Sequence, residues 1–154
     1  MQKIDGMDKL TNILDKFLEE FECTSIVDTN FYCLTASNVI AVSLVVSEKN
    51  SSSFMSRVNR LYPDIHADEF LWSFLHEVGH IETINTLDDD ELYFSETQKK
   101  NENITNEVYY ELPDEFAATE WAANYMRENT EKVAKFWNEV QSVIMNIYQI
   151  NNIS

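Results

Sequence analysis

Residues 69–81 read EFLWSFLHEVGHI and contain the short pattern His76-Glu77-Val78-Gly79-His80 within a run of apolar side chains. The apolar side chains recur at helical spacings and cover much of the circumference, which predicts a central, buried helix. Asp64 or Asp68 can cap its start, and its end is expected near Ile81. Side chains four residues apart lie on the same face of a helix, so the two imidazoles of the pattern are neighbours.

The His76 and His80 imidazoles can therefore close on one metal ion. Zinc accepts imidazole nitrogen at about 2.0–2.1 Å, and a catalytic zinc site has three protein ligands and one water. Glu77 lies about 100° around the helix from His76, so its carboxylate can reach that water without occupying a coordination position. In such a site the carboxylate acts as general base on the zinc-activated water. The pattern thus predicts a zinc-dependent hydrolase centre.

A third zinc ligand is expected from a carboxylate on another helix. The only other histidine, His66, precedes the motif helix, and no histidine follows His80. A His₂Glu ligand set is therefore the remaining route to a catalytic site. The segment 113–123, PDEFAATEWAA, offers three candidate carboxylates: Asp114, Glu115 and Glu120.

Helical period separates these three carboxylates. Glu115 shares a face with Ala118 and Ala122, and such small side chains allow a close approach to the motif helix. Glu120 lies on roughly the other side, and Asp114 suits the first turn, where the helix dipole favours a carboxylate. The same dipole argument offers a purely structural role for Glu115, but the shared face favours Glu115 as the third ligand.

Composition and charge exclude several other classes of function. The 154 residues carry a formal net charge of −16, which disfavours binding to the phosphate backbone of nucleic acids. Only two glycines are present, Gly6 and Gly79, too few for a dinucleotide-binding fingerprint or a phosphate-binding loop. The 44% of hydrophobic residues indicates a folded chain rather than an acidic disordered one.

The sequence shows no signal for export or for insertion into a membrane. No apolar stretch of signal-peptide type follows the N-terminus. The most apolar run, residues 39–46, is interrupted by Ser43 and is far shorter than the roughly 20 residues that a spanning helix needs. Two cysteines do not form a disulfide framework in a chain of this length. We expect a soluble, cytoplasmic protein that does not interact with membranes.

Hydrophobic periodicity predicts an α+β fold, with helices packed on a small, mostly antiparallel sheet. Residues 1–154 show no linker or internal repeat, so a single domain is expected. Residues 85–106 are polar and acidic and are interpreted as a loop or flap. Serines 51–53 can cap a short helix that Pro63 ends. Strands are expected at 25–28, 31–35 and 39–46, with a turn at 35–38, and further helices at 7–21, 113–127 and 130–150.

The two motifs together resemble the ImmA/IrrE family of zinc metallopeptidases. In that family H-E-x-G-H is followed by E-x-x-A-x-x-F-A on a later helix, as in His76–His80 and Glu115–Ala122 here. The resemblance implies a zincin-like fold of gluzincin type, with Zn²⁺ held by His76, His80 and Glu115 and with Glu77 as catalytic base. Members are typically bacterial, or carried by phages and mobile elements. They cleave a helix-turn-helix repressor, so the implied partner is a basic DNA-binding protein.

The resemblance covers about a third of the chain and has departures. Trp121 replaces the usual Phe, and Asn124–Glu128 replaces an apolar stretch that usually ends in Pro. Two other hypotheses belong beside the peptidase. One is a catalytically inactive protein of the same fold that acts by binding a partner. The other is a structural zinc protein, although structural sites usually have four ligands and are rich in Cys.

Overall fold

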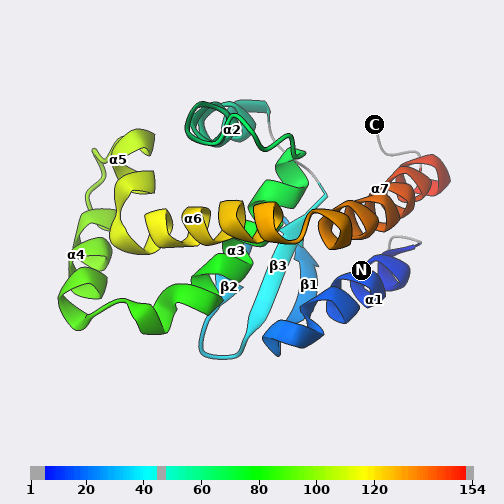
Figure 1. Ribbon diagram of the computed structural model, residues 1–154, viewed down its shortest axis with the longest axis horizontal. Coiled ribbons are helices and arrows are strands. Elements are labelled where there is room, and N and C mark those ends of the chain that lie inside the picture. Colours follow the sequence, from blue (N-terminus) through cyan, green and yellow to red (C-terminus); the bar gives the residue numbers. More distant parts are fainter. Residues whose placement is uncertain (1–5, 45–47, 152–154) are drawn as a thin grey trace. The chain divides into compact units, whose positions relative to one another are not determined.

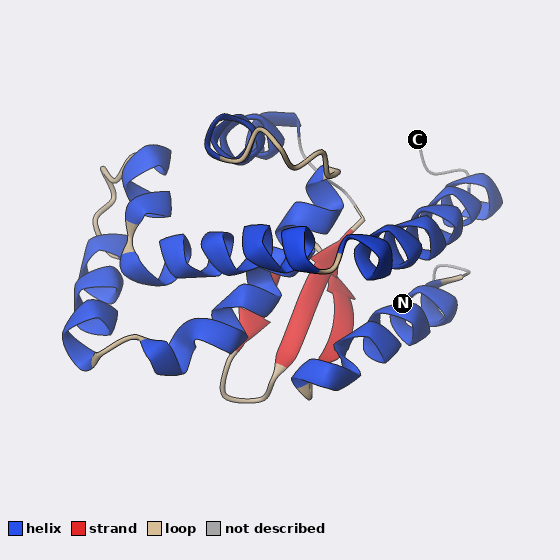
Figure 2. Ribbon diagram, viewed as in Figure 1, coloured by secondary structure: helices blue, strands red, loops and turns tan. Residues whose placement is uncertain are grey.

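The computed structural model describes residues 6–44 and 48–151, shown in Figures 1 and 2. The chain is α+β, and its described part contains seven α-helices and one three-stranded sheet. The chain divides into two compact units. We call residues 1–45 with 129–154 the sheet unit, and residues 46–128 the motif unit. The single-domain interpretation of residues 1–154 stays a prediction. Among the described residues, no helix is both long and apolar enough to cross a membrane.

The sheet unit contains a mixed sheet. Its strands are β1 (Thr24–Asp28), β2 (Tyr32–Leu34) and β3 (Val39–Ser43), in the spatial order β1-β3-β2. β3 pairs in parallel with β1 and antiparallel with β2, so the expected hairpin is confirmed but a mostly antiparallel sheet is wrong. The most apolar strand occupies the centre because Ile40, Ala41 and Val42 are fully buried there. β1 alternates between exposed and half-buried residues and so suits an edge.

Two helices complete the sheet unit: α1 (Met7–Leu18), followed by the short 3₁₀ turn η1 (Glu19–Phe21), and α7 (Thr130–Asn151). They lie side by side in Figure 1, and α1 also packs on β1. The helix expected at 7–21 buries one apolar face, on which Leu10, Leu14 and Leu18 are fully buried. Phe17 of α1 stacks on Phe136 of α7, with 4.0 Å between the ring centroids. The apolar residues Val133, Phe136, Val140 and Ile147 of α7 are buried and form part of the core.

The described residues of the motif unit form helices joined by loops, with no strand among them. The helices are α2 (Glu48–Leu61), α3 (Glu69–Thr83), the 3₁₀ turn η2 (Ile84–Thr86), α4 (Asp89–Lys99), α5 (Asn106–Glu111) and α6 (Pro113–Glu128). α3 packs along α6, and α4 and α5 also contact α6. Asp68, rather than Asp64, caps α3, since its Oδ1 accepts a hydrogen bond of 2.8 Å from the Phe70 amide. α2 begins at Glu48, so the expectation that serines 51–53 cap it is wrong.

The expectation of a loop over residues 85–106 is also wrong, because α4 and the start of α5 lie in this range. The acidic run that looks like a solvated loop is a helix start. Asp88 accepts from the Glu91 amide and the Glu91 carboxylate accepts from the Asp88 amide, which forms a capping box. Ser95 is the only buried residue of α4, so the helix has no apolar stripe for a sequence pattern to reveal. This helix ends at Lys99, beside the candidate site.

Candidate metal centre

Three side chains from α3 and α6 converge on one point in the motif unit. The Nε2 atom of His76 lies 3.0 Å from Oε1 of Glu115, and Nε2 of His80 lies 3.0 Å from Oε2 of the same carboxylate. One ligand atom from each of the three residues lies within 4.8 Å of the others. His76 and Glu115 are buried and His80 is largely buried. Of the three candidate carboxylates in the segment 113–123, Glu115, which helical period favours, is the one that meets both histidines.

A glycine allows α3 and α6 to approach closely enough for this convergence. A Cβ placed on Gly79 would lie 2.4 Å from the carbonyl oxygen of Ala118 and 3.0 Å from its Cα. Such distances are far below van der Waals contact, and the neighbouring atoms belong to the backbone of α6. Ala118 and Ala122 are fully buried on the facing side. The small residues therefore place Glu115 within reach of the histidine pair.

Thr119 sets the orientation of the His76 imidazole. The Thr119 hydroxyl donates a 3.0 Å hydrogen bond to the Glu115 carbonyl one turn earlier. Its oxygen lies 2.9 Å from Nδ1 of His76 and so accepts the Nδ1 proton. In the tautomer that carries a proton on Nδ1, the Nε2 atom is the ring nitrogen left to bind a metal in place of its 3.0 Å contact with Glu115. A metal-binding imidazole needs this tautomer, and a hydrogen bond of this kind is its usual support.

The ring of Phe54 in α2 closes one side of the site. It packs edge-on against the His76 imidazole, with 5.5 Å between the ring centroids. Phe54 is itself buried, which keeps that side of the imidazole away from water. An apolar side chain beside a metal-binding residue excludes water, which strengthens the electrostatic interactions within the site.

The Glu115 carboxylate and the two imidazoles strongly influence one another's pKa values. Burial acts to raise the pKa of Glu115, but hydrogen bonds and positive charge from His76 and His80 hold it well below its usual range. Burial likewise acts to lower the pKa of His80. The hydrogen bond to Glu115 and the charge of that carboxylate outweigh burial, so the pKa of His80 is raised. The carboxylate is therefore ionised and available as a ligand.

A lysine that the sequence did not point to contacts the same carboxylate. The Nζ atom of Lys99, at the end of α4, lies 2.8 Å from Oε2 of Glu115 and 2.6 Å from Oδ2 of Asp114. Burial opposes the charge of this ammonium, but the two carboxylates raise the pKa of Lys99 well above its ordinary value. Asp114 thus pairs with Lys99 and also accepts from the Glu115 amide at 2.9 Å. It supports the site without contacting the histidines.

Glu77 is half-buried on α3, next to the ligand pair in sequence. Burial raises the pKa of Tyr110 on α5, and the negative charges of Glu115 and Glu77 raise it further. The charge of Glu77 also contributes to the raised pKa of His80. Glu77 is therefore electrostatically close to the histidine pair and to α5. The remaining candidates, His66 and Glu120, are exposed and do not belong to the convergent group.

Comparisons with protein-family models, with curated proteins and with solved structures each give no match for this chain. The site is a buried His-His-Glu group that could bind a metal ion. Two imidazole nitrogens and one carboxylate oxygen form a donor set that zinc accepts, and three protein ligands leave a coordination position for water. Imidazole ligands also suit other transition metals, including copper, iron and nickel.

Replacing Lys99 by Met is expected to tighten zinc binding by about ten-fold, as measured by competition with a fluorescent chelator. The ammonium lies a few ångströms from the ligand atoms and repels a divalent cation, and it stabilises Glu115 when no metal is bound. The metal-free variant should therefore also melt at a lower temperature than the metal-free wild type.

The control for this variant is Lys100→Met, which removes the same charge one residue away. Lys100 is 76% exposed and pairs with Glu96 at 3.5 Å, a surface contact of little energetic weight. Its zinc affinity should equal that of the wild type. Weaker zinc binding in Lys99→Met would mean that Lys99 supports the metal site by orienting Glu115.

Proposed function

We propose that this protein is a zinc-dependent endopeptidase whose metal ligands are His76, His80 and Glu115 and whose general base is Glu77. The observation that carries the proposal is the meeting of both histidines with the Glu115 carboxylate at 3.0 Å, on two helices that a glycine allows into contact. A His₂Glu set with an adjacent Glu in H-E-x-x-H is the arrangement of a catalytic rather than a structural zinc site.

The chain's own residues divide the chemistry between them. When bound, zinc would act as a Lewis acid on the peptide carbonyl and would lower the pKa of a water. His76, His80 and Glu115 hold the ion, and Thr119 keeps the imidazole of His76 in the tautomer that directs Nε2 inward. Glu77 takes the proton from the attacking water and gives it to the leaving amine. Burial and the negative charges of Glu115 and Glu77 raise the pKa values of Tyr109 and Tyr110 on α5, so both phenols keep their protons at neutral pH.

The resemblance to the ImmA/IrrE family supplies the substrate class of the proposal. We infer a zincin-like arrangement of the chain and a basic helix-turn-helix repressor as the protein that is cut. The net charge of −16 would accelerate the encounter with a basic partner at low salt. No nucleic acid is needed for the reaction.

One observation favours the alternative, a catalytically inactive protein that acts by binding a partner. The ammonium of Lys99 already compensates the charge of Glu115, so the site is electrostatically satisfied without a metal. In that case the fold would persist without zinc, and a Glu77→Gln variant would keep its function. Metal content separates the two functions directly.

Elemental mass spectrometry of the untagged protein is expected to find about one zinc per chain in the wild type and little in His76→Ala. Removing one of three ligands leaves the ion with too few donors for stable binding. Glu115→Ala should lose zinc in the same way, because its carboxylate contacts both histidines.

Glu120→Ala is the matched control, since it removes the same charge from an exposed position on the same helix. It should keep the zinc content of the wild type. Absence of metal from the wild type, even after zinc is added back, would overturn the peptidase and leave the partner-binding alternative. Loss of zinc in Glu120→Ala but not in Glu115→Ala would move the third ligand.

A further inference from the structure

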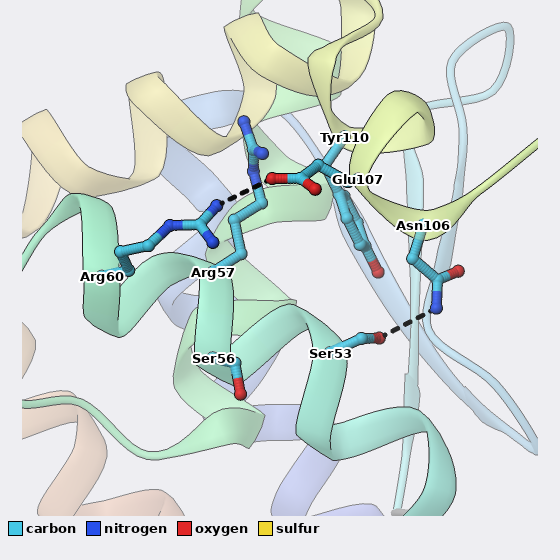
Figure 3. Close-up of a pocket in the computed structure, with 7 residues that line it drawn as sticks. All are labelled: Ser53, Ser56, Arg57, Arg60, Asn106, Glu107 and Tyr110. Carbon is cyan, nitrogen blue, oxygen red and sulfur yellow. Dashed lines mark hydrogen bonds and ion pairs between the residues drawn. The ribbon is translucent and has the colours of Figure 1, made fainter.

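A small polar pocket lies between α2 and α5 in the motif unit, near the candidate metal centre. Its volume is about 230 Å³, and its lining is shown in Figure 3: Ser53, Ser56, Arg57, Arg60, Asn106, Glu107 and Tyr110. Two guanidinium groups in one pocket are notable in a chain with only 11 basic residues and a net charge of −16. We propose that this pocket binds a carboxylate group of a peptide, with Arg57 as its anchor.

Arg57 is the residue that points to a ligand. It is 5% exposed, yet its Nε and Nη1 atoms donate no hydrogen bond within the described part of the chain. Nη1 lies 2.8 Å from Oε1 of Glu111, which is ion-pair distance without the direction of a hydrogen bond. A buried guanidinium with unused donors is costly, and a carboxylate matches its planar set of N–H groups.

Arg60 supplies the second charge and already has a carboxylate as partner. Its Nη2 lies 3.3 Å from Oε1 of Glu107, the pair marked by a dashed line in Figure 3. Both side chains of the pair are largely exposed, 60% and 70%, so the contact is weak and exchangeable. An incoming carboxylate can take the place of Glu107 on Arg60.

The charge of the pocket favours a carboxylate over a phosphate. Glu107 in the lining and Glu111 beside it offset the two arginines, so the pocket with its ion-pair partners is close to neutral. A carboxylate adds one negative charge, whereas a phosphate adds close to two and requires more compensation. Ser53 and Asn106 line the opposite side of the pocket from the Arg57 guanidinium and share a hydrogen bond of 3.3 Å (Figure 3).

The pocket is connected to the metal centre through aromatic rings. Tyr110 lines the pocket, and its ring centroid lies 5.3 Å from that of Phe54. The Phe54 ring also contacts the His76 imidazole, at 5.5 Å. Resting on the proposed function, the pocket is a specificity subsite for an acidic side chain near the cleaved bond. A basic repressor would then be cut only where such a residue is present.

The test uses NMR on the full chain, in its zinc-loaded and chelator-treated forms, with two blocked pentapeptides as probes. Ala-Ala-Glu-Ala-Ala should shift the Arg57 Nε–Hε resonance and bind at least ten-fold tighter than Ala-Ala-Gln-Ala-Ala. Glu107→Gln removes the competing carboxylate and should tighten binding of the Glu peptide. Arg57→Met and Arg60→Met should each weaken it by about ten-fold.

Lys100→Met, which removes one positive charge from an exposed site, should bind the Glu peptide as the wild type does. Equal affinity for the two peptides would overturn the proposal. The proposal would also be overturned if inorganic phosphate bound with a lower Kd than the Glu peptide and displaced it. The pocket would then be a phosphate site. If the chain binds the Glu peptide but holds no zinc and cuts no peptide, the pocket proposal is supported and the proposed peptidase function is wrong. The two proposals can therefore fail separately.

Discussion

Glu77→Gln is expected to reduce peptide cleavage by roughly 10²–10⁴-fold, the size of a general-base contribution, while the zinc content stays at about one per chain. Gln has the shape of Glu but cannot accept the proton of the attacking water. The three ligand side chains lie on other positions and keep their contacts. Cleavage is measured on purified repressors encoded beside the gene and on a proteome-derived peptide library read by mass spectrometry.

Glu82→Gln is the matched control for this substitution. Glu82 is an exposed glutamate on the same helix, α3, and it does not belong to the His-His-Glu group. The control should cut at the wild-type rate. Equal cleavage in Glu77→Gln and wild type would rule out the assigned general base. Loss of zinc in Glu77→Gln would show instead that this carboxylate is needed to hold the metal.

The sequence predicted the part of the site that follows from a single helix. His76 and His80 share a face because four residues make about one turn, and the surrounding apolar residues of α3 are buried as the pattern requires. The choice of Glu115 also followed from helical period, because Ala118 and Ala122 mark the face on which α6 meets α3. Helical spacing is therefore sufficient to predict which side chains share one face of a helix.

Residues that reach the site from elsewhere gave no such signal. Lys99 lies on a helix with one buried residue, so its segment had no apolar period and was interpreted as a loop. The parallel pairing of β1 with β3 was missed for a related reason, since strand order depends on which strand the core buries most deeply. Thr119 could have been found, because it follows Glu115 by four residues and so shares its face.

Gly79→Ala is expected to destabilise the motif unit by about 1–3 kcal/mol and to weaken zinc binding by at least ten-fold. The new Cβ would lie 2.4 Å from the Ala118 carbonyl oxygen, whereas carbon atoms pack at about 3.5–4.0 Å, so α6 must move away from α3. Ala favours helix over Gly by about 0.8–1.0 kcal/mol, which offsets only part of this cost. Thermal melting and chelator competition measure the two effects.

The obstacle at Gly79 is backbone, and this makes the prediction specific. Shortening the facing side chain in a Gly79→Ala, Ala118→Gly double variant leaves the carbonyl in place, so zinc affinity should stay low. Ser73→Thr adds one methyl group to a half-buried position on the same helix and should keep zinc affinity at the wild-type level. Unchanged melting and zinc affinity in Gly79→Ala would mean that Glu115 reaches the histidines without this contact. Loss of zinc affinity in Gly79→Ala and in the double variant, but not in Ser73→Thr, would support the role of Gly79. This fourth position of the motif supplies no ligand, yet it would set the distance between ligands on two helices.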